Sequence, residues 1–414
     1  MKILIATDSY KYNMSGVTAS VLALRSGLTE LGHEVKILSL SNTVKSFREE
    51  DDYYIKSVPA LCYPGIRMSF AMHDPLIKEI EEWKPDLIHV QSEGSVYQMA
   101  LRIKKHCDIP LVMTCHTDYA HFAFGGLKST RPVKAVMRTA GKHFYQRATL
   151  VTVPSQKAKN FSLLDTQRDR ITVVPNGIEL DRFNQRLTAH ERHELRTSLG
   201  IDDHTAVLLI VSRLSKEKNI REVINFFPRL LEKLPDTKLL IVGDGPDKKH
   251  LEKLTKKLQL EDRIIFTGRV PSDSVWRYYD AGDVFVSAST FEVHSISYLE
   301  ALSNGLPMLC RKDDALIGVL EQGENGLIYD SQDEFTDYAY KLLSDYGLRA
   351  RMGSNSKRRS ERFSKDSFAS AMFEVYEDAV RTCNGEDALE ITHKSAPDKL
   401  TYDYDRKYDI KTES

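Results

Sequence analysis

The chain has 414 residues, of which 41% are hydrophobic and 28% are charged, and its formal net charge is -1. These values are typical of a globular protein with two domains, because a single hydrophobic core rarely serves so long a chain. The near-zero charge excludes a generally basic nucleic-acid binder, so we expect no nucleic-acid partner.

Three features bear on the cell compartment. No apolar run approaches the length that spans a bilayer. The start, MKILIATDSY, has the pattern of a buried strand and not that of a signal peptide. The cysteines are scattered, odd in number, and form no metal-binding pair. We therefore expect a reduced, cytoplasmic protein.

The first half of the chain alternates predicted strands with predicted helices. Helices are expected at 15–32, where apolar residues follow helical spacing and Gly32 ends the pattern, and at 74–85. The predicted strands are 2–7, 33–40, 86–92, 110–117, 149–155 and 171–177. Strands separated by helices indicate a parallel sheet covered on both faces.

The second half restarts this pattern after a polar, helix-prone joining stretch. Its predicted strands are 205–214, 237–245, 263–270, 283–290, 306–311 and 326–330. The sequence thus predicts an α/β protein with two doubly wound, Rossmann-like domains, residues 1–180 and 181–365, facing a central cleft. A further helix is expected over 366–383, and residues 384–414 are expected to form a loosely ordered polar tail.

Two cations follow the first strand of the second half. Arg213 and Lys218 lie just beyond it, and the carboxyl ends of parallel strands form the usual ligand edge of such sheets. Two cations there could neutralise the charge of a departing diphosphate. A solvated basic loop is the alternative interpretation.

Glycines and a backbone edge follow other strands. Gly16 opens the first helix, whose N–H groups could meet a phosphate or a sugar, although a tight turn alone explains a single glycine. Gly243 and Gly245 form a turn into a helix, for which a structural role and a functional one are equally supported. The backbone of Val270 could pair with a base.

A histidine and two glutamates stand at other strand ends. His116 ends the strand 110–117, where it could bond a substrate hydroxyl; a buried histidine bonded to backbone is the alternative. Glu292 and Glu300 lie in an otherwise apolar stretch, and eight helical residues rise roughly 12 Å. The two carboxylates are therefore expected to reach different parts of an extended ligand, not to form one acid–base pair. Ordinary helix acids are the alternative.

Taken together, these motifs resemble the family-4 retaining glycosyltransferases of GT-B fold. The likeness rests on E-x7-E, the upstream R-x4-K pair, the glycine of the first turn and the HT(D) strand end, with VPNGIELDRF (174–183) and GDGP (243–246) in order. It covers roughly residues 1 to 380. Members use an activated-sugar donor, keep the anomeric configuration and usually need no metal, so no cofactor is expected.

The resemblance implies a role for each matching residue. Glu292 would hold the hexose hydroxyls of the donor, and Glu300 would hold the ribose hydroxyls. Arg213 and Lys218 would bind the diphosphate. Four residues are predicted to be catalytic, namely His116 and three of those just named: Glu292, Arg213 and Lys218.

The resemblance also implies roles for three residues other than these glutamates and cations. Val270 would meet the base through its backbone, Gly16 would face the phosphate, and His116 would bind the donor sugar near the reacting carbon. Where many members have glycine three residues after the first glutamate, this chain has Ser295, which affects the fit of the hexose. The helix 366–383 would return to the N-terminal domain, as in relatives.

The acceptor is suggested by a basic stretch in the first domain. From Tyr119 to Leu164 there is no Asp or Glu, and apolar residues are mixed with spaced cations, a pattern that suits anionic lipid surfaces as well as a solvated helix. The cations assigned to the membrane or acceptor are Lys128, Arg131, Lys134, Arg138, Lys142 and Arg147. The chain is also similar to bacterial diacylglycerol glucosyltransferases in SGVTASV, HTDYAHF and the E-x7-E block.

The leading hypothesis is transfer of glucose from UDP-glucose to a lipid such as diacylglycerol, forming an α-glycosidic bond, by a protein that attaches peripherally to the inner face of the cell membrane. Three alternatives stay open: a hexosyltransferase with a soluble or polysaccharide acceptor, a sugar-nucleotide epimerase or hydrolase of the same fold, and an inactive sugar-nucleotide binder. A GT-A enzyme is disfavoured, because its D-x-D pattern occurs only at 403–405 in the polar tail.

Overall fold

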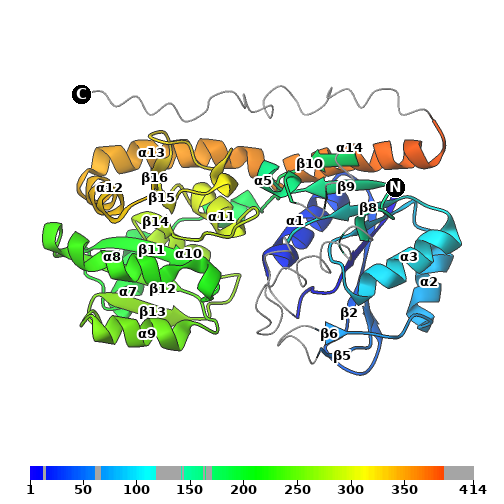
Figure 1. Cartoon of the computed structure of the whole chain (residues 1–414), viewed down its shortest axis with the longest axis horizontal. Helices are drawn as coiled ribbons and strands as arrows, with labels where there is room; N and C mark the ends of the chain where they lie inside the picture. Colours follow the sequence, from blue (N-terminus) through cyan, green and yellow to red (C-terminus); the bar gives the residue numbers. More distant parts are fainter. Residues whose placement is uncertain are drawn as a thin grey trace.

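The computed structural model describes residues 1–12, 15–60, 67–117, 141, 144–161, 164 and 170–386. Each half of the chain forms one large sheet with helices on both faces, and the two halves lie side by side (Figure 1). This is the α/β architecture of two doubly wound domains that the sequence predicts.

The N-terminal sheet has eight strands in the order β10-β9-β8-β7-β1-β2-β4-β3, all paired in parallel except β3 with β4. Its elements are β1 (Lys2–Thr7), α1 (Gly16–Glu30), β2 (Glu34–Leu40), β3 (Phe47–Glu49), β4 (Asp52–Ile55), α2 (Pro75–Trp83), β7 (Leu87–Val90), α3 (Ser95–Cys107), β8 (Leu111–Thr114), β9 (Leu150–Val153), α5 (Gln156–Lys159) and β10 (Ile171–Val173). A separate two-stranded ribbon pairs β5 (Val58–Pro59) with β6 (Arg67–Met68).

The C-terminal sheet has six parallel strands in the order β13-β12-β11-β14-β15-β16. Its elements are α6 (Leu180–Asn184), α7 (Ala189–Ser198), β11 (Ala206–Val211), α8 (Ile220–Lys233), β12 (Thr237–Val242), α9 (Lys248–Lys257), β13 (Ile264–Gly268), α10 (Trp276–Ala281), β14 (Val284–Ser287), α11 (Ile296–Asn304), β15 (Met308–Arg311), β16 (Gly326–Tyr329), α12 (Gln332–Ser344) and α13 (Tyr346–Ser360), and α14 (Lys365–Cys383) follows them.

Alternation of apolar side chains explains why each sheet is buried on both faces. In β1, Leu4 packs into one hydrophobic cluster while Ile3 and Ile5 pack into the cluster on the opposite face. In β11, Leu208 and Val207 divide in the same way between two clusters. Successive residues of a strand point to opposite faces, so a continuous apolar run produces a central strand with helices on either side.

Every strand predicted from the sequence is present, but the short strands β3 to β6 were missed. β4 is only four residues long and is preceded by a charged turn in which Glu50 has a φ of 50°. Such a strand lacks the long apolar run by which the others are recognised. It forms because β2 offers it a parallel partner.

The described chain passes between the two halves along two adjacent segments. Ile178 donates its N–H to the carbonyl of Phe363 and accepts from the N–H of Lys365, both at 2.9 Å. A Cβ on Gly177 would lie 2.6 Å from the Cβ of Phe368. Glycine is therefore required where the outgoing segment passes the start of α14.

Helix α14 lies along the N-terminal half although it follows the whole C-terminal sheet (Figure 1). Its buried face, which includes Phe368, Met372 and Tyr376, joins the same cluster as β1 and α1. A Cβ on Gly27 of α1 would lie 2.7 Å from the Cβ of Ala369. The two helices are thus in close backbone contact, and α14 completes the cover of the N-terminal sheet.

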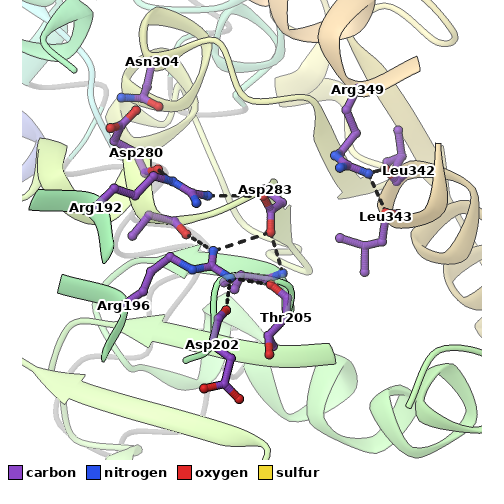
Figure 2. A network of polar contacts seen from close by, with 12 residues as sticks. Arg192, Arg196, Asp202, Thr205, Asp280, Asp283, Asn304, Leu342, Leu343 and Arg349 are labelled. Atoms are coloured by element: carbon purple, nitrogen blue, oxygen red, sulfur yellow. Dashed lines mark hydrogen bonds and ion pairs between the residues drawn. The ribbon is translucent and has the colours of Figure 1, made fainter. Parts of the chain in front are cut away.

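A buried arginine ties the segment between the halves to the C-terminal sheet (Figure 2). Arg196 of α7 is 1% exposed. It donates to the carbonyls of Ala281 at 3.0 Å and Asp202 at 2.9 Å, and also to that of Thr205. Asp283 lies 3.8 Å away and compensates part of its charge. The arginine therefore supplies a side-chain donor to backbone carbonyls that lie beside α7.

We expect Arg196→Leu to lower the free energy of unfolding by about 2 kcal/mol, because buried carbonyls lose their donor and Asp283 loses a counter-charge. Urea denaturation monitored by tryptophan fluorescence measures this change. Arg221→Leu, at an exposed position of α8, is the matched control. Equal midpoints for the two variants would contradict the structural role of Arg196.

Candidate functional site

A cleft of about 1390 Å³ lies between the two halves of the protein. Its walls come from the start of α1, from α6, from the loops beyond β11, β12 and β13, and from the segment leading into α11. Six residues predicted from the sequence line it: Gly16, Arg213, Lys218, Val270, Glu292 and Glu300. The five from the C-terminal half converge because the carboxyl ends of parallel strands meet at one edge of the sheet, and Gly16 joins them from the N-terminal half.

The glycine turn after β12 is packed directly on the loop after β11. A Cβ on Gly243 would overlap the carbonyl oxygen of Ser212, and a Cβ on Gly245 would overlap that of Leu214. Gly243 also has a φ of 138°, which side chains rarely adopt. The turn thus has a structural role, and both glycines also line the cleft.

Glu292 and Lys218 form an ion pair within the cleft, with 2.5 Å between Lys218 Nζ and Glu292 Oε1. Glu292 is only 9% exposed and lies in the loop before α11. The sequence assigned these two residues to different parts of a ligand and did not foresee their contact. The pairing neutralises both charges as the structure stands.

Arg213 supplies the positive charge that Lys218 does not. Its side chain is exposed and lines the cleft beyond β11. Within the described part of the chain, its guanidinium makes no ion pair. An uncompensated cation at a sheet edge is suited to binding an anionic group such as a phosphate.

Glu300 occupies a different environment from Glu292. It lies inside α11, half-buried, and accepts a hydrogen bond from the hydroxyl of Tyr279 at 2.7 Å. Burial raises the pKa of Glu300 to about 7, against the opposing effects of the Tyr279 hydrogen bond and the charge of Arg182. The two glutamates are thus held by different side chains, one by a cation and one by a phenol.

Gly16 and His116 come from the N-terminal half. Gly16 begins α1 behind Ser15, whose hydroxyl accepts the N–H of Thr18 at 3.2 Å. A Cβ on Gly16 would only touch Ile296 at 3.7 Å, so the protein itself tolerates a larger residue there. His116 follows β8, is half-buried, and is not among the side chains that line the cleft. It is close enough to the cleft residue His294 to lower the pKa of that ring.

Sequence analysis missed three cleft residues that have a buried polar atom without a hydrogen-bond partner. These are Arg182 at Nη2, Ser212 at Oγ and His294 at Nδ1. A buried polar atom without a partner is costly, and a polar ligand would relieve that cost. Arg182 falls inside VPNGIELDRF and His294 inside the E-x7-E block. Their place in these motifs was the sequence feature that could have marked them as site residues.

Ser295 lies at the start of α11 and lines the cleft. Its φ of -75° is accessible to any residue, so the backbone does not require glycine here. Its hydroxyl lies 3.0 Å from that of Ser297. The serine thus places a polar group at the cleft wall where glycine would leave space.

Most of the predicted basic surface lies outside the described residues, namely Lys128, Arg131, Lys134, Arg138 and Lys142. Arg147 is described and exposed, and its carbonyl accepts a hydrogen bond from Lys104 Nζ at 2.9 Å. Over the described residues, no helix is both long and apolar enough to cross a membrane. The same ranges hold no cluster of three or more potential metal-ligating side chains.

Comparisons with known proteins cover both halves of the chain. The N-terminal half matches the model of Glycosyltransferase Family 4 over residues 14–182, and the C-terminal half matches that of Glycosyl transferases group 1 over 191–359. The chain is 30% identical to the alpha-monoglucosyldiacylglycerol synthase of Streptococcus pneumoniae, over 93% of this chain and 87% of that protein. It is 28% identical to the synthase of the same name from Acholeplasma laidlawii, over 92% of this chain and 98% of that protein.

A solved structure shows the same fold. HepE of Anabaena in complex with UDP-glucose superposes with a TM-score of 0.71 at 18% identity, covering 91% of this chain and all of that one. The strand-end cleft, the two family models and the relatives point the same way: the chain belongs to the family-4 glycosyltransferases of GT-B fold.

Proposed function

We propose that this glycosyltransferase moves glucose from UDP-glucose to a lipid acceptor such as diacylglycerol, forming an α-glycosidic bond. The observation that carries the proposal is the cleft that gathers an arginine without an ion pair to the described residues, a Lys–Glu pair and a second glutamate at the sheet edge. Relatives named for diacylglycerol glucosylation, similar over nearly the whole chain, support the choice of acceptor.

The cleft offers a place for each part of a nucleotide sugar. Arg213, with Lys218 beside it, would bind the diphosphate, and Gly16 would present the N–H groups at the start of α1 to the same group. Glu300 would accept hydrogen bonds from the ribose diol and Glu292 from the hexose. The backbone of Val270 would meet the base.

The reaction breaks the bond between the anomeric carbon and the diphosphate oxygen and forms one to the acceptor oxygen. We propose attack on the face that the diphosphate leaves, with the acceptor proton passing to the departing phosphate oxygen, so that configuration is retained. Arg213 would stabilise the charge that develops on the diphosphate. The proposed reaction assigns no step to a metal ion.

Contact with the acceptor is proposed for the basic segment of the N-terminal half. Lys128, Arg131, Lys134, Arg138, Lys142 and Arg147 would bind the anionic surface of the membrane from the cytoplasmic side. Each cation near such a surface contributes about 1 kcal/mol of attraction. A lipid acceptor would then be reached without a membrane-spanning helix.

We expect label to pass from radiolabelled UDP-glucose to diacylglycerol in vesicles, in the presence of EDTA, and faster when anionic lipid is included. UDP-galactose and GDP-mannose are the donor controls, and zwitterionic vesicles are the surface control. UDP release without labelled lipid would overturn the lipid acceptor in favour of a soluble acceptor or hydrolysis. Equal rates and equal co-sedimentation with both vesicle types would overturn the membrane surface.

A further inference from the structure

A buried line of polar side chains runs from helix α14 to His116. The hydroxyl of Tyr376 lies 2.6 Å from His89 Nδ1. Gln91 places its amide nitrogen 3.2 Å from the ring nitrogens of His89, and its Oε1 lies 2.6 Å from His116 Nε2. Tyr376 and His89 are fully buried, and Gln91 is 3% exposed. The line therefore has little freedom to rearrange.

The register of the sheet explains this convergence. His89 is in β7 and Gln91 directly follows it, while His116 follows the neighbouring strand β8. The N–H of Gln91 is fixed by the carbonyl of Ala6 in β1 at 2.8 Å. Thr114 holds the second nitrogen of His89 at 2.7 Å. Contacts from the neighbouring strands β1 and β8 thus hold Gln91 and His89 in place.

The contact with Gln91 determines which nitrogen of His116 carries a proton. An amide oxygen only accepts hydrogen bonds, so His116 Nε2 must donate to Gln91 Oε1. Burial lowers the pKa of His116 to about 4, so the ring is neutral near pH 7. A neutral ring protonated at Nε2 has Nδ1 as a hydrogen-bond acceptor.

We propose that Gln91 is a positioning residue, which accepts a hydrogen bond from the Nε2–H of His116 and so fixes the tautomer whose Nδ1 accepts a hydrogen bond from a donor-sugar hydroxyl. This proposal rests on the proposed function and on the role that the family resemblance implies for His116, which is to bind the donor sugar near the reacting carbon. The ring of His89 contacts the amide nitrogen of Gln91, and Tyr376 contacts His89 in turn. These contacts orient the amide so that its oxygen faces His116.

The titratable groups around His116 determine how its pKa would respond to a substitution. Among the described residues, the titratable groups whose charge couples to it are His89 from β7 and His294 from the loop before α11, and burial lowers their pKa values to about 3 and about 4. Tyr376 of α14, behind His89, has its pKa raised well above the ordinary value by burial. Burial is also the cause of the His116 shift itself, so a single introduced carboxylate would dominate.

Gln91→Glu places a carboxylate where the amide oxygen lies. A carboxylate in hydrogen-bond contact stabilises the imidazolium and raises its pKa by about 1 to 3 units. The imidazolium carries a proton at Nδ1 and can no longer accept there. We therefore expect the acid limb of kcat/KM for sugar transfer to move upward by about 1 to 3 pH units, with recovery of activity at alkaline pH.

Two further variants separate positioning from general damage. Gln259→Glu makes the same change at an exposed site after α9 and should reproduce the wild-type profile. Gln91→Leu removes the acceptor without adding charge and should lower kcat/KM at every pH without moving the acid limb. A Gln91→Glu profile that coincides with the wild-type profile would overturn the proposal.

The experiment also distinguishes this proposal from the proposed function. NMR titration of labelled histidine in folded Gln91→Glu protein reports the pKa of His116 whether or not the variant is active, and an unchanged value would overturn the role of Gln91. Absence of UDP and UDP-glucose binding to the wild-type protein, measured by calorimetry, would instead overturn the proposed function.

Discussion

Replacing Glu292 with alanine is expected to lower kcat/KM for sugar transfer by about 10² to 10³-fold. The carboxylate is 9% exposed in the cleft, and the proposed hexose hydroxyls would each lose a charge-assisted acceptor, at about 1.5 to 3 kcal/mol per bond. Two such bonds correspond to at least a hundredfold in rate, since 1.36 kcal/mol is tenfold. Steady-state kinetics with UDP-glucose measures the loss.

The ion pair with Lys218 makes the choice of controls important. Removing Glu292 leaves Lys218 uncompensated in a half-buried position. Glu292→Gln keeps the shape and one acceptor oxygen, so its activity should lie between that of Glu292→Ala and the wild type. Glu261→Ala, at an exposed site, should leave activity unchanged. Wild-type turnover of Glu292→Ala would remove this residue from the donor site.

Replacing Arg213 with alanine is expected to lower kcat by about 10² to 10³-fold, the range seen when one group that stabilises transition-state charge is removed. Lys218 is already paired with Glu292 at 2.5 Å, whereas Arg213 lines the cleft beyond the same strand and makes no ion pair with the described residues. Single-turnover kinetics separates this loss in the chemical step from weaker binding. UDP affinity should also fall.

Arg269 offers a matched control inside the same cleft. It is exposed and lines the cleft beyond β13, beside the proposed base contact at Val270. If Arg213 acts through its position and not through general attraction of an anion, Arg269→Ala should change kcat by less than about threefold. Equal losses in the two variants would contradict the assignment of the diphosphate to Arg213.

The charges in the cleft explain why the loss of Glu292 and the loss of Arg213 are expected to affect different parts of the donor. Glu292 and Lys218 neutralise each other, whereas Arg213 is not compensated by an ion pair in the described part of the chain. A ligand with both hydroxyls and phosphates would replace the ion pair between Lys218 and Glu292. Its phosphates would then contact Lys218, and its hydroxyls would contact Glu292. Pairing before binding reduces the cost of holding a nearly buried carboxylate without a ligand.

Much of the site was predictable because the relevant residues follow apolar strands directly. Arg213, Val270 and Glu292 each follow a strand that the sequence identifies by its continuous hydrophobic run. Parallel pairing then places all of these strand ends at one edge. The likeness in motif order added the family, and the comparisons bear it out.

Other parts of the site depend on contacts that no local pattern encodes. Lys218 and Glu292 are 74 residues apart, and Tyr376 meets His89 across 287 residues. Arg182, Ser212 and His294 entered the site only because their polar atoms are buried at the cleft without partners. Burial and partnership are properties of the packed molecule.

The sequence by itself therefore determined the two sheets, the succession of their long strands along the chain and the residues at the strand ends, because hydrophobic periodicity and turn residues act over a few positions. Only the tertiary structure decided which of those residues pair, which remain uncompensated, and that Gln91 holds His116. These outcomes depend on strand register and on the return of α14 to the N-terminal sheet, which bring distant segments within hydrogen-bond distance.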